Sequence, residues 1–240
     1  MTSAVTKSRT HEDIPKFFYL WLMCVPFVVH LGFGYFDKQR AFFDRWIESE
    51  LGIIENLTVF VLLPAALMLL YTGKNYLRKS KVLLAIWFVL AALVCIGFGG
   101  EEASWGQHWF GWESPEYFES NNRQGETNFH NFDIQIGRTV KAVLTLAIII
   151  GGLILPLVRK ADMAHGDTRF IDNIVGTRSC VPVAFWVFFV RLIERFKTWF
   201  DLDWLILAVN LKELQELYIA LFLFIYAWAT MKRATKFLDP

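Results

Sequence analysis

The chain has 240 residues, of which 55% are hydrophobic and 17% are aromatic, and its formal net charge is +1. Its apolar residues form uninterrupted blocks instead of alternating with polar ones, which argues against an ordinary soluble domain. No segment concentrates enough Lys and Arg to neutralise a row of phosphates, so the composition excludes a nucleic-acid partner.

The apolar blocks have the length of membrane-spanning helices. At about 1.5 Å per residue, roughly 20 residues cross a hydrocarbon core about 30 Å thick. The sequence therefore predicts an all-α protein in which residues 1–240 form a single integral membrane domain, a bundle of about six transmembrane helices with the lipid bilayer as its partner. The expected spans are 17–36, 53–72, 81–100, 139–158, 181–199 and 214–231.

The fifth segment is open to two interpretations. Its apolar part is short and is followed by Arg191, Glu194, Arg195 and Lys197 at helical spacing. It is either a span with an ion-paired face turned into the bundle or a half-inserted helix followed by an interfacial one. Parity favours a span, because the last block ends in a basic flank that needs an even number of crossings.

Basic residues predict the orientation. The loop 73–81 carries Lys74, Arg78, Lys79 and Lys81 and no acid, which is typical of a cytoplasmic loop. Counting from this loop places both termini in the cytoplasm and the acidic 101–138 segment outside.

The outer loop 101–138 is expected to be structured. Ser114-Pro115-Glu116 is a helix-start pattern, and Asn121-Asn122 with the following Gln-Gly should end that helix. Its tryptophans suit the headgroup level of the membrane. The loop is expected to fold back over the glutamates at the end of the third span.

Acidic residues gather at the outer ends of two spans. Glu55 opens the second span, Glu101 and Glu102 end the third, and Ser104 follows. Because ionisable groups at the membrane edge are costly, we take these four as candidate catalytic residues. A carboxyl in such a place can act as a general acid or base, although a helix rotates by about 100° per residue and cannot aim both adjacent glutamates at one point. Ser104 and His108 have the spacing of a nucleophile and its base.

A metal site is a second possibility. Glu126 and His130 lie one helical turn apart if their segment is helical, and together with Glu102 they are the candidate ligands of a divalent metal ion. The HExxH and ExxH signatures of known metal helices are absent.

The stretches "GGEEASWGQ" and "QGETNFHN", with "GIIENLT" at the start of the second span, resemble a family of uncharacterised bacterial polytopic membrane proteins that carry E-E-x-S-W-G-Q and Q-G-E-T-N-x-H-N motifs. The resemblance covers roughly residues 50–135 and implies no activity. It implies a bacterial inner membrane as the location. The matching positions are Glu55, Glu101, Glu102, Ser104, Gln107, Glu126 and His130, whereas arginine is usual in that pattern where this chain has His108.

These observations lead to three hypotheses. The first is a membrane-embedded enzyme that acts on a lipid or lipid-linked substrate through a periplasm-facing carboxylate and histidine site. The second is a non-catalytic subunit or assembly factor that docks on other membrane subunits through the acidic, Trp-rich outer loop. The third is a transporter, which the lack of a detectable inverted repeat disfavours.

Overall fold

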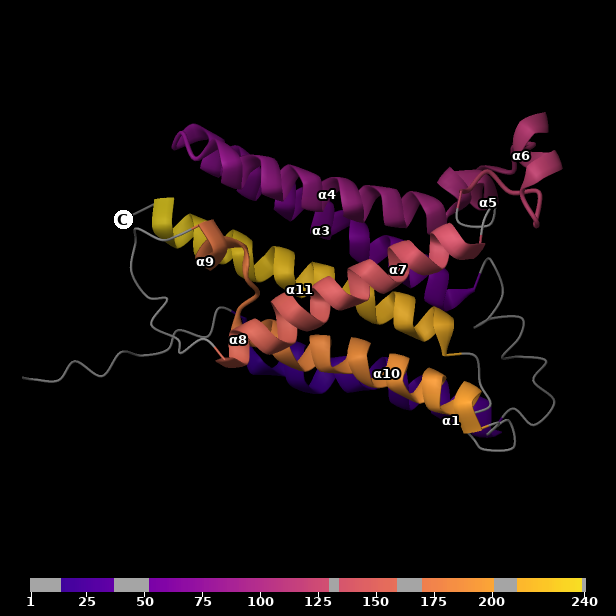
Figure 1. Ribbon diagram of the computed structural model, residues 1–240. Coiled ribbons are helices and arrows are strands. Elements are labelled where there is room, and N and C mark those ends of the chain that lie inside the picture. The colour runs from indigo at the N-terminus through magenta and orange to yellow at the C-terminus, as the bar shows by residue number, and fades with distance from the viewer. Residues whose placement is uncertain (1–13, 37–51, 130–133, 159–169, 201–210, 239–240) are drawn as a thin grey trace, which may run out of the picture.

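The structure is a computed structural model that describes residues 14–36, 52–129, 134–158, 170–200 and 211–238. Within these ranges the chain is helical and contains no strand. The prediction of an all-α membrane bundle is confirmed (Figure 1).

Every expected span is helical. The first comprises the π-helix η1 (Phe17–Trp21), the 3-10 helix η2 (Leu22–Cys24) and α1 (Val25–Phe36), and the fourth comprises α7 (Ile134–Ile148), η4 (Ile149–Ile154) and α8 (Leu155–Val158). The others are α3 (Ile53–Arg78), α4 (Val82–Glu102), α10 (Val181–Phe200) and α11 (Lys212–Leu238). Four segments of the described chain are long and apolar enough to cross a membrane: Ile53–Arg78, Val82–Glu102, Gly137–Val158 and Lys212–Thr235.

The fifth segment is a continuous helix that runs lengthwise with the others (Figure 1). Val183, Val187 and Val190 lie on its fully buried face. Arg191 donates a hydrogen bond to the Gln215 side chain of α11 at 3.4 Å. A polar residue of α10 thus faces into the bundle, whereas α10 is not one of the four described helices that are apolar enough to cross a membrane. Both interpretations of residues 181–199 stay predictions.

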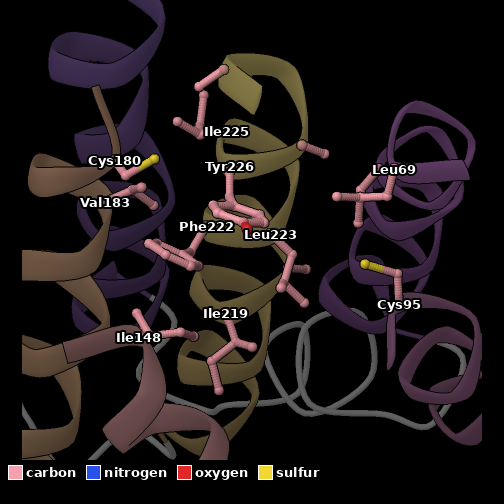
Figure 2. Packing of buried hydrophobic residues seen from close by; sticks show 14 of the residues in the cluster. Leu69, Cys95, Ile148, Cys180, Val183, Ile219, Phe222, Leu223, Ile225 and Tyr226 are labelled. Carbon is pink, nitrogen blue, oxygen red and sulfur yellow. The ribbon is translucent and has the colours of Figure 1, made fainter. Parts of the chain in front are cut away.

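Helix α11 lies at the centre of the bundle. Its apolar window is 78% buried, against 22–33% for the other three candidate spans. Figure 2 shows side chains of α11 packed between Cys180 and Val183 on one side and Leu69 and Cys95 on the other. The remaining helices therefore expose much of their apolar surface to the lipid.

The hydroxyl of Tyr218 in α11 forms hydrogen bonds with the backbone of the first span. The Tyr218 hydroxyl accepts a hydrogen bond from the Phe27 backbone N–H at 3.1 Å and donates one to the Met23 carbonyl at 2.8 Å. These two backbone groups are four residues apart, so the hydroxyl stands where a direct helical hydrogen bond would close. The hydroxyl takes the place of one α-helical hydrogen bond, and the first span departs from α-helical geometry at this point, in η1 and η2.

The two ends of the bundle differ (Figure 1). At one, which we call the loop end, lie the starts of α3, α7 and α11 and the segment 103–129. At the other, the basic end, lie the turn 79–81 between α3 and α4, the short helices α9 (Phe170–Ile174) and η5 (Arg178–Cys180), and the end of α11. Phe18 packs against Trp228 at 5.4 Å between ring centroids, so the first described span also starts towards the basic end.

The outer loop is structured, as predicted. It contains η3 (Ser104–Gly106), α5 (Gln107–Phe110) and α6 (Glu116–Asn121). Helix α6 begins directly after Pro115 and ends before Asn122, where the sequence placed its boundaries. Ser114 does not cap it, because its hydroxyl accepts a hydrogen bond from the Gln107 side chain at 3.0 Å instead.

Candidate functional site

The third span ends in a sharp left-handed turn. Helix α4 stops at Glu102, and Ser104 and Trp105 follow with φ angles of 43° and 56°. Such angles cost about 1–3 kcal/mol each in residues other than glycine, so the surrounding contacts must hold them. The Trp105 indole does so by donating to Glu101 Oε1 at 2.9 Å and by packing on Gly100, where a Cβ would lie 2.9 Å from the ring.

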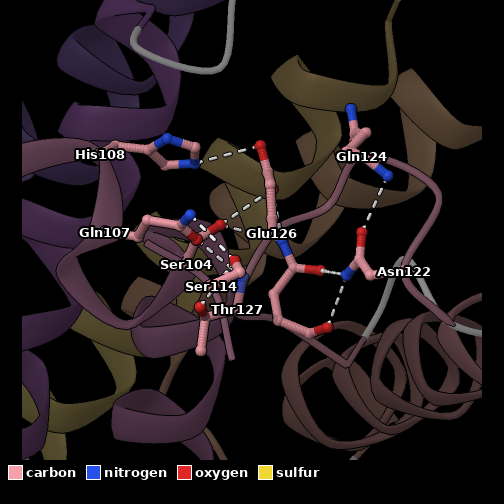
Figure 3. Close-up of polar contacts among 9 residues, drawn as sticks. Ser104, Gln107, His108, Ser114, Asn122, Gln124, Glu126 and Thr127 are labelled. Carbon is pink, nitrogen blue, oxygen red and sulfur yellow. Dashed lines mark hydrogen bonds and ion pairs between the residues drawn. The ribbon is translucent and has the colours of Figure 1, made fainter. Parts of the chain in front are cut away.

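Glu126 is the centre of a buried polar cluster formed by the loop (Figure 3). Its Oε2 accepts hydrogen bonds from the Ser104 hydroxyl at 2.9 Å and from the Asn128 amide at 2.6 Å. Its Oε1 faces His108 Nε2 at 3.4 Å. The Asn128 amide also donates to Ser104 Oγ at 2.9 Å, so one carboxylate joins three parts of the loop.

This arrangement differs from a nucleophile-base pair. The left-handed turn removes Ser104 and His108 from a common helix face, and their side chains meet on opposite oxygens of Glu126. In a catalytic triad the imidazole lies between the hydroxyl and the acid, whereas here the acid lies between the other two. Ser104 is also only 1% exposed, so its hydroxyl serves the loop and is remote from solvent and lipid.

Glu101 holds the C-terminal end of the same loop, at Phe129, against the end of α4. Besides Trp105, its carboxylate accepts a hydrogen bond from the Phe129 backbone N–H at 2.7 Å. Gln107 adds a further tie, because its side-chain oxygen accepts from the Thr127 N–H at 2.7 Å. The loop therefore folds back onto the end of α4, as the sequence suggested.

A small pocket at the loop end collects three of the titratable residues. It is lined by Glu55 and Asn56 of α3, Glu102 of α4 and His108 and Trp109 of α5, together with Val59 and Ala103. The Trp109 indole donates to Asn56 Oδ1 at 2.8 Å and its ring stacks on Phe60. Of the predicted catalytic residues, the structure thus brings Glu55 and Glu102 together and places Glu101 and Ser104 in the loop contacts beside them.

Glu102 also belongs to a carboxylate group that the sequence analysis missed. One oxygen from each of Glu102, Glu213 and Glu216 lies within 4.8 Å of the others, which is close enough for one cation. Lys141 of α7 forms an ion pair with Glu216 and is also influenced by the charges of Glu102 and Glu213. The Lys141 ammonium thus supplies part of the positive charge that a metal ion would bring to these carboxylates. The sequence signal was the i, i+3 pair of acids in the first turn of the last span, on one helix face.

The carboxylate group continues into the bundle as a line of polar contacts. The Gln215 amide donates to Thr145 Oγ1 of α7 at 3.3 Å, and Gln215 is 1% exposed. Its oxygen accepts from Arg191 of α10. Polar side chains of three helices therefore meet inside the loop-end half of the membrane domain, where each needs a partner.

The predicted metal ligands are not assembled as expected. Residues 126–129 are not helical, so the helical spacing assumed for Glu126 and His130 does not apply, and His130 lies outside the described residues. Glu126 is occupied by Ser104, Asn128 and His108, while Glu102 points to a different set of acids. If a metal binds among the described residues, its ligands are Glu102, Glu213 and Glu216, whose oxygens suit a hard divalent cation.

We name the assembly of Glu55, Glu102, His108, Glu126, Glu213 and Glu216 the loop-end site. His108 connects its parts, because this residue lines the pocket and contacts Glu126. Comparisons of the chain with protein-family models, curated proteins and solved structures gave no match.

Proposed function

We propose that the protein is an integral membrane enzyme that acts on a lipid or lipid-linked substrate at the loop-end site. The observation that carries the proposal is the pocket in which Glu55, Glu102 and His108, from three different helices, share one wall. Groups that titrate in different pH ranges seldom meet at the edge of a membrane without a chemical task.

His108 is the residue best suited to move a proton. Glu126 Oε1 lies 3.4 Å from its Nε2, and a carboxylate in this position can orient an imidazole. Glu55 and Glu102 on the pocket wall can then serve as a second acid or base. A divalent cation at Glu102, Glu213 and Glu216 would supply positive charge for a phosphate headgroup, and Lys141 supplies some of it already.

The surroundings of the pocket suit a lipid substrate. Trp109 stacks on Phe60, and Phe60 and Leu57 of α3 are 65% and 43% exposed on the outside of the bundle. An acyl chain lying along α3 would therefore bring its headgroup beside the pocket, whose volume of about 10 Å³ is that of a single water site. The lysines and arginines of the 73–81 loop favour a cytoplasmic basic end, and hence a periplasm-facing loop end in a bacterial inner membrane.

The test compares the lipids of cells that lack the protein with those of cells that express it. Wild-type protein should change at least one lipid species, and Glu102→Gln and His108→Gln should abolish that change at equal protein level. Glu116→Gln removes the same charge from an exposed position of α6 and should retain the activity. The proposal is refuted if wild-type cells have the same lipid profile as cells that lack the protein, or if Glu102→Gln and His108→Gln retain the wild-type change.

Metal analysis of the purified protein tests the cation separately. A bound divalent metal should be lost in a Glu213→Gln/Glu216→Gln variant and retained in Glu116→Gln. Equal metal content in both variants would exclude this set of ligands.

A docking role for the loop is the second candidate. Phe110, Tyr117 and Phe129 of the outer loop are 75%, 65% and 60% exposed, and exposed aromatic side chains are frequent at protein interfaces. Extraction in a mild detergent should then give a heteromeric complex that a Phe110→Ser/Tyr117→Ser variant no longer forms. A monomer or homodimer from wild-type cells would contradict this role.

A further inference from the structure

A pocket lies at the basic end of the bundle, away from the loop-end site. It has a volume of about 400 Å³, within the usual range of ligand pockets. One wall comes from the end of α3, the turn and the start of α4, and the other from α9. The lining residues are Tyr76, Ser80, Lys81, Val82, Leu83, Leu84, Phe170 and Asn173.

Both walls of this pocket are held in place by hydrogen bonds. The Tyr76 hydroxyl donates to Asn173 Oδ1 at 3.0 Å, which ties α3 to α9 across the floor. On the far side of α9, the Arg233 guanidinium of α11 donates to the carbonyls of Asp172, Asn173 and Val175. The pocket is therefore formed before any ligand arrives, which lowers the cost of binding.

One rim of the pocket is basic. Lys81 lines the pocket and Lys79 lies two residues before it, whereas Lys74 and Arg78 belong to α3 and do not line it. All four side chains are exposed, and none makes an ion pair with another described residue. Helix α4 starts at this rim, so the positive end of its dipole adds to the field of the lysines. The acid nearest along the lining elements is Asp172 of α9, which already has an interaction of its own.

The rest of the pocket is apolar and continues onto the lipid-facing surface. Val82, Leu83 and Phe170 line it and are 51%, 71% and 41% exposed. Ile86, one turn further along α4, is exposed as well. A ligand with a negative head and a hydrocarbon tail would place its head at Lys81 and its tail along α4.

We propose that this pocket binds one anionic phospholipid, with its phosphate at Lys79 and Lys81 and an acyl chain against Val82, Leu83 and Phe170. Basic pockets between helices at the cytoplasmic side of membrane proteins are suited to such headgroups. The site is independent of the proposed enzyme activity, since it lies at the opposite end of the bundle (Figure 1).

Thermal-shift titration of the full chain in neutral detergent tests the proposal. Phosphatidylglycerol should raise the melting midpoint of the wild type saturably, whereas phosphatidylcholine and inorganic phosphate should not. Lys79→Gln/Lys81→Gln should weaken the apparent affinity for phosphatidylglycerol by about tenfold or more, as expected for the loss of two cations at a membrane surface. Val82→Trp, which fills the pocket without a change of charge, should weaken it too.

Arg138→Gln/Arg195→Gln is the matched control, because it removes two exposed positive charges from the loop end. It should bind phosphatidylglycerol as the wild type does. The proposal fails if phosphatidylcholine or inorganic phosphate stabilises equally well, if the control double variant loses as much affinity as Lys79→Gln/Lys81→Gln, or if Val82→Trp has no effect.

Discussion

Replacing Glu126 should open the outer loop. In Glu126→Ala the buried Ser104 hydroxyl loses its acceptor, and the Asn128 side-chain NH2 group keeps only Ser104 as an acceptor. An unsatisfied buried polar group costs about 1–3 kcal/mol, and hydrogen bonds to a charged group contribute about 1.5–3 kcal/mol each. We therefore expect a loss of about 2–4 kcal/mol in the free energy that keeps the loop closed. Glu126→Gln retains an acceptor oxygen, and its neutral hydrogen bonds are about half as strong, so its loss should be about 1–2 kcal/mol.

Trypsin measures this opening, because Arg123 lies in the loop. Cleavage within an ordered segment requires local unfolding, and its rate follows the population of the open form when reclosing is fast. The rate at Arg123 should rise by about 30-fold or more in Glu126→Ala and by less in Glu126→Gln. Glu119→Gln, at an exposed position of α6, should be cleaved like the wild type. Equal rates for Glu126→Ala and Glu119→Gln would refute the anchoring role of Glu126.

Two further predictions concern the bundle. Gly152→Ala should lower the melting midpoint in detergent by an amount equivalent to about 1–3 kcal/mol, because its Cβ would lie 2.2 Å from the Phe222 ring, whereas Gly151→Ala meets nothing within 4 Å and should be neutral. Equal midpoints for the two variants would contradict this packing. Lys141→Met should destabilise by about 2 kcal/mol, since it leaves acids buried without their cation, and adding Glu216→Gln should restore part of that loss. Strictly additive effects would show that the ion pair is not coupled.

The helices were predictable because the membrane imposes one rule on every span. A charge-free block of suitable length has few alternatives to a helix in hydrocarbon, so the ranges agree with the structure to within a few residues at most ends. The third span, for instance, was expected over 81–100 and is observed over Val82–Glu102. Helix α3 runs beyond its expected end at residue 72, to Arg78. The expected end marked the last residue of the charge-free block, whereas a helix can continue past the membrane through charged residues.

The site was only partly predictable, because its contacts depend on tertiary structure. The acids at the outer ends of the second and third spans do come together, since spans of known direction bring their ends to one surface. The i, i+3 spacing of Glu213 and Glu216 is also common in the polar flank of a span, and only helix packing brings these acids and Lys141 against Glu102. The left-handed turn at Ser104 and Trp105 likewise changes the direction of the chain, so the residues that follow do not lie where a continued helix would place them.

The central position of α11 has a consequence for biogenesis. Among the four candidate spans of the described chain, the one that buries the largest share of its apolar window also follows the other three in sequence. Tyr218 forms hydrogen bonds with the backbone of Met23 and Phe27, and Tyr226 forms hydrogen bonds with Trp87 and the Ile174 carbonyl. All of these partners are synthesised before α11. The contacts that the preceding spans make with α11 can therefore form only after α11 has been synthesised. A chain that stops before residue 212 would lack α11, and the surfaces that α11 covers would be left without it.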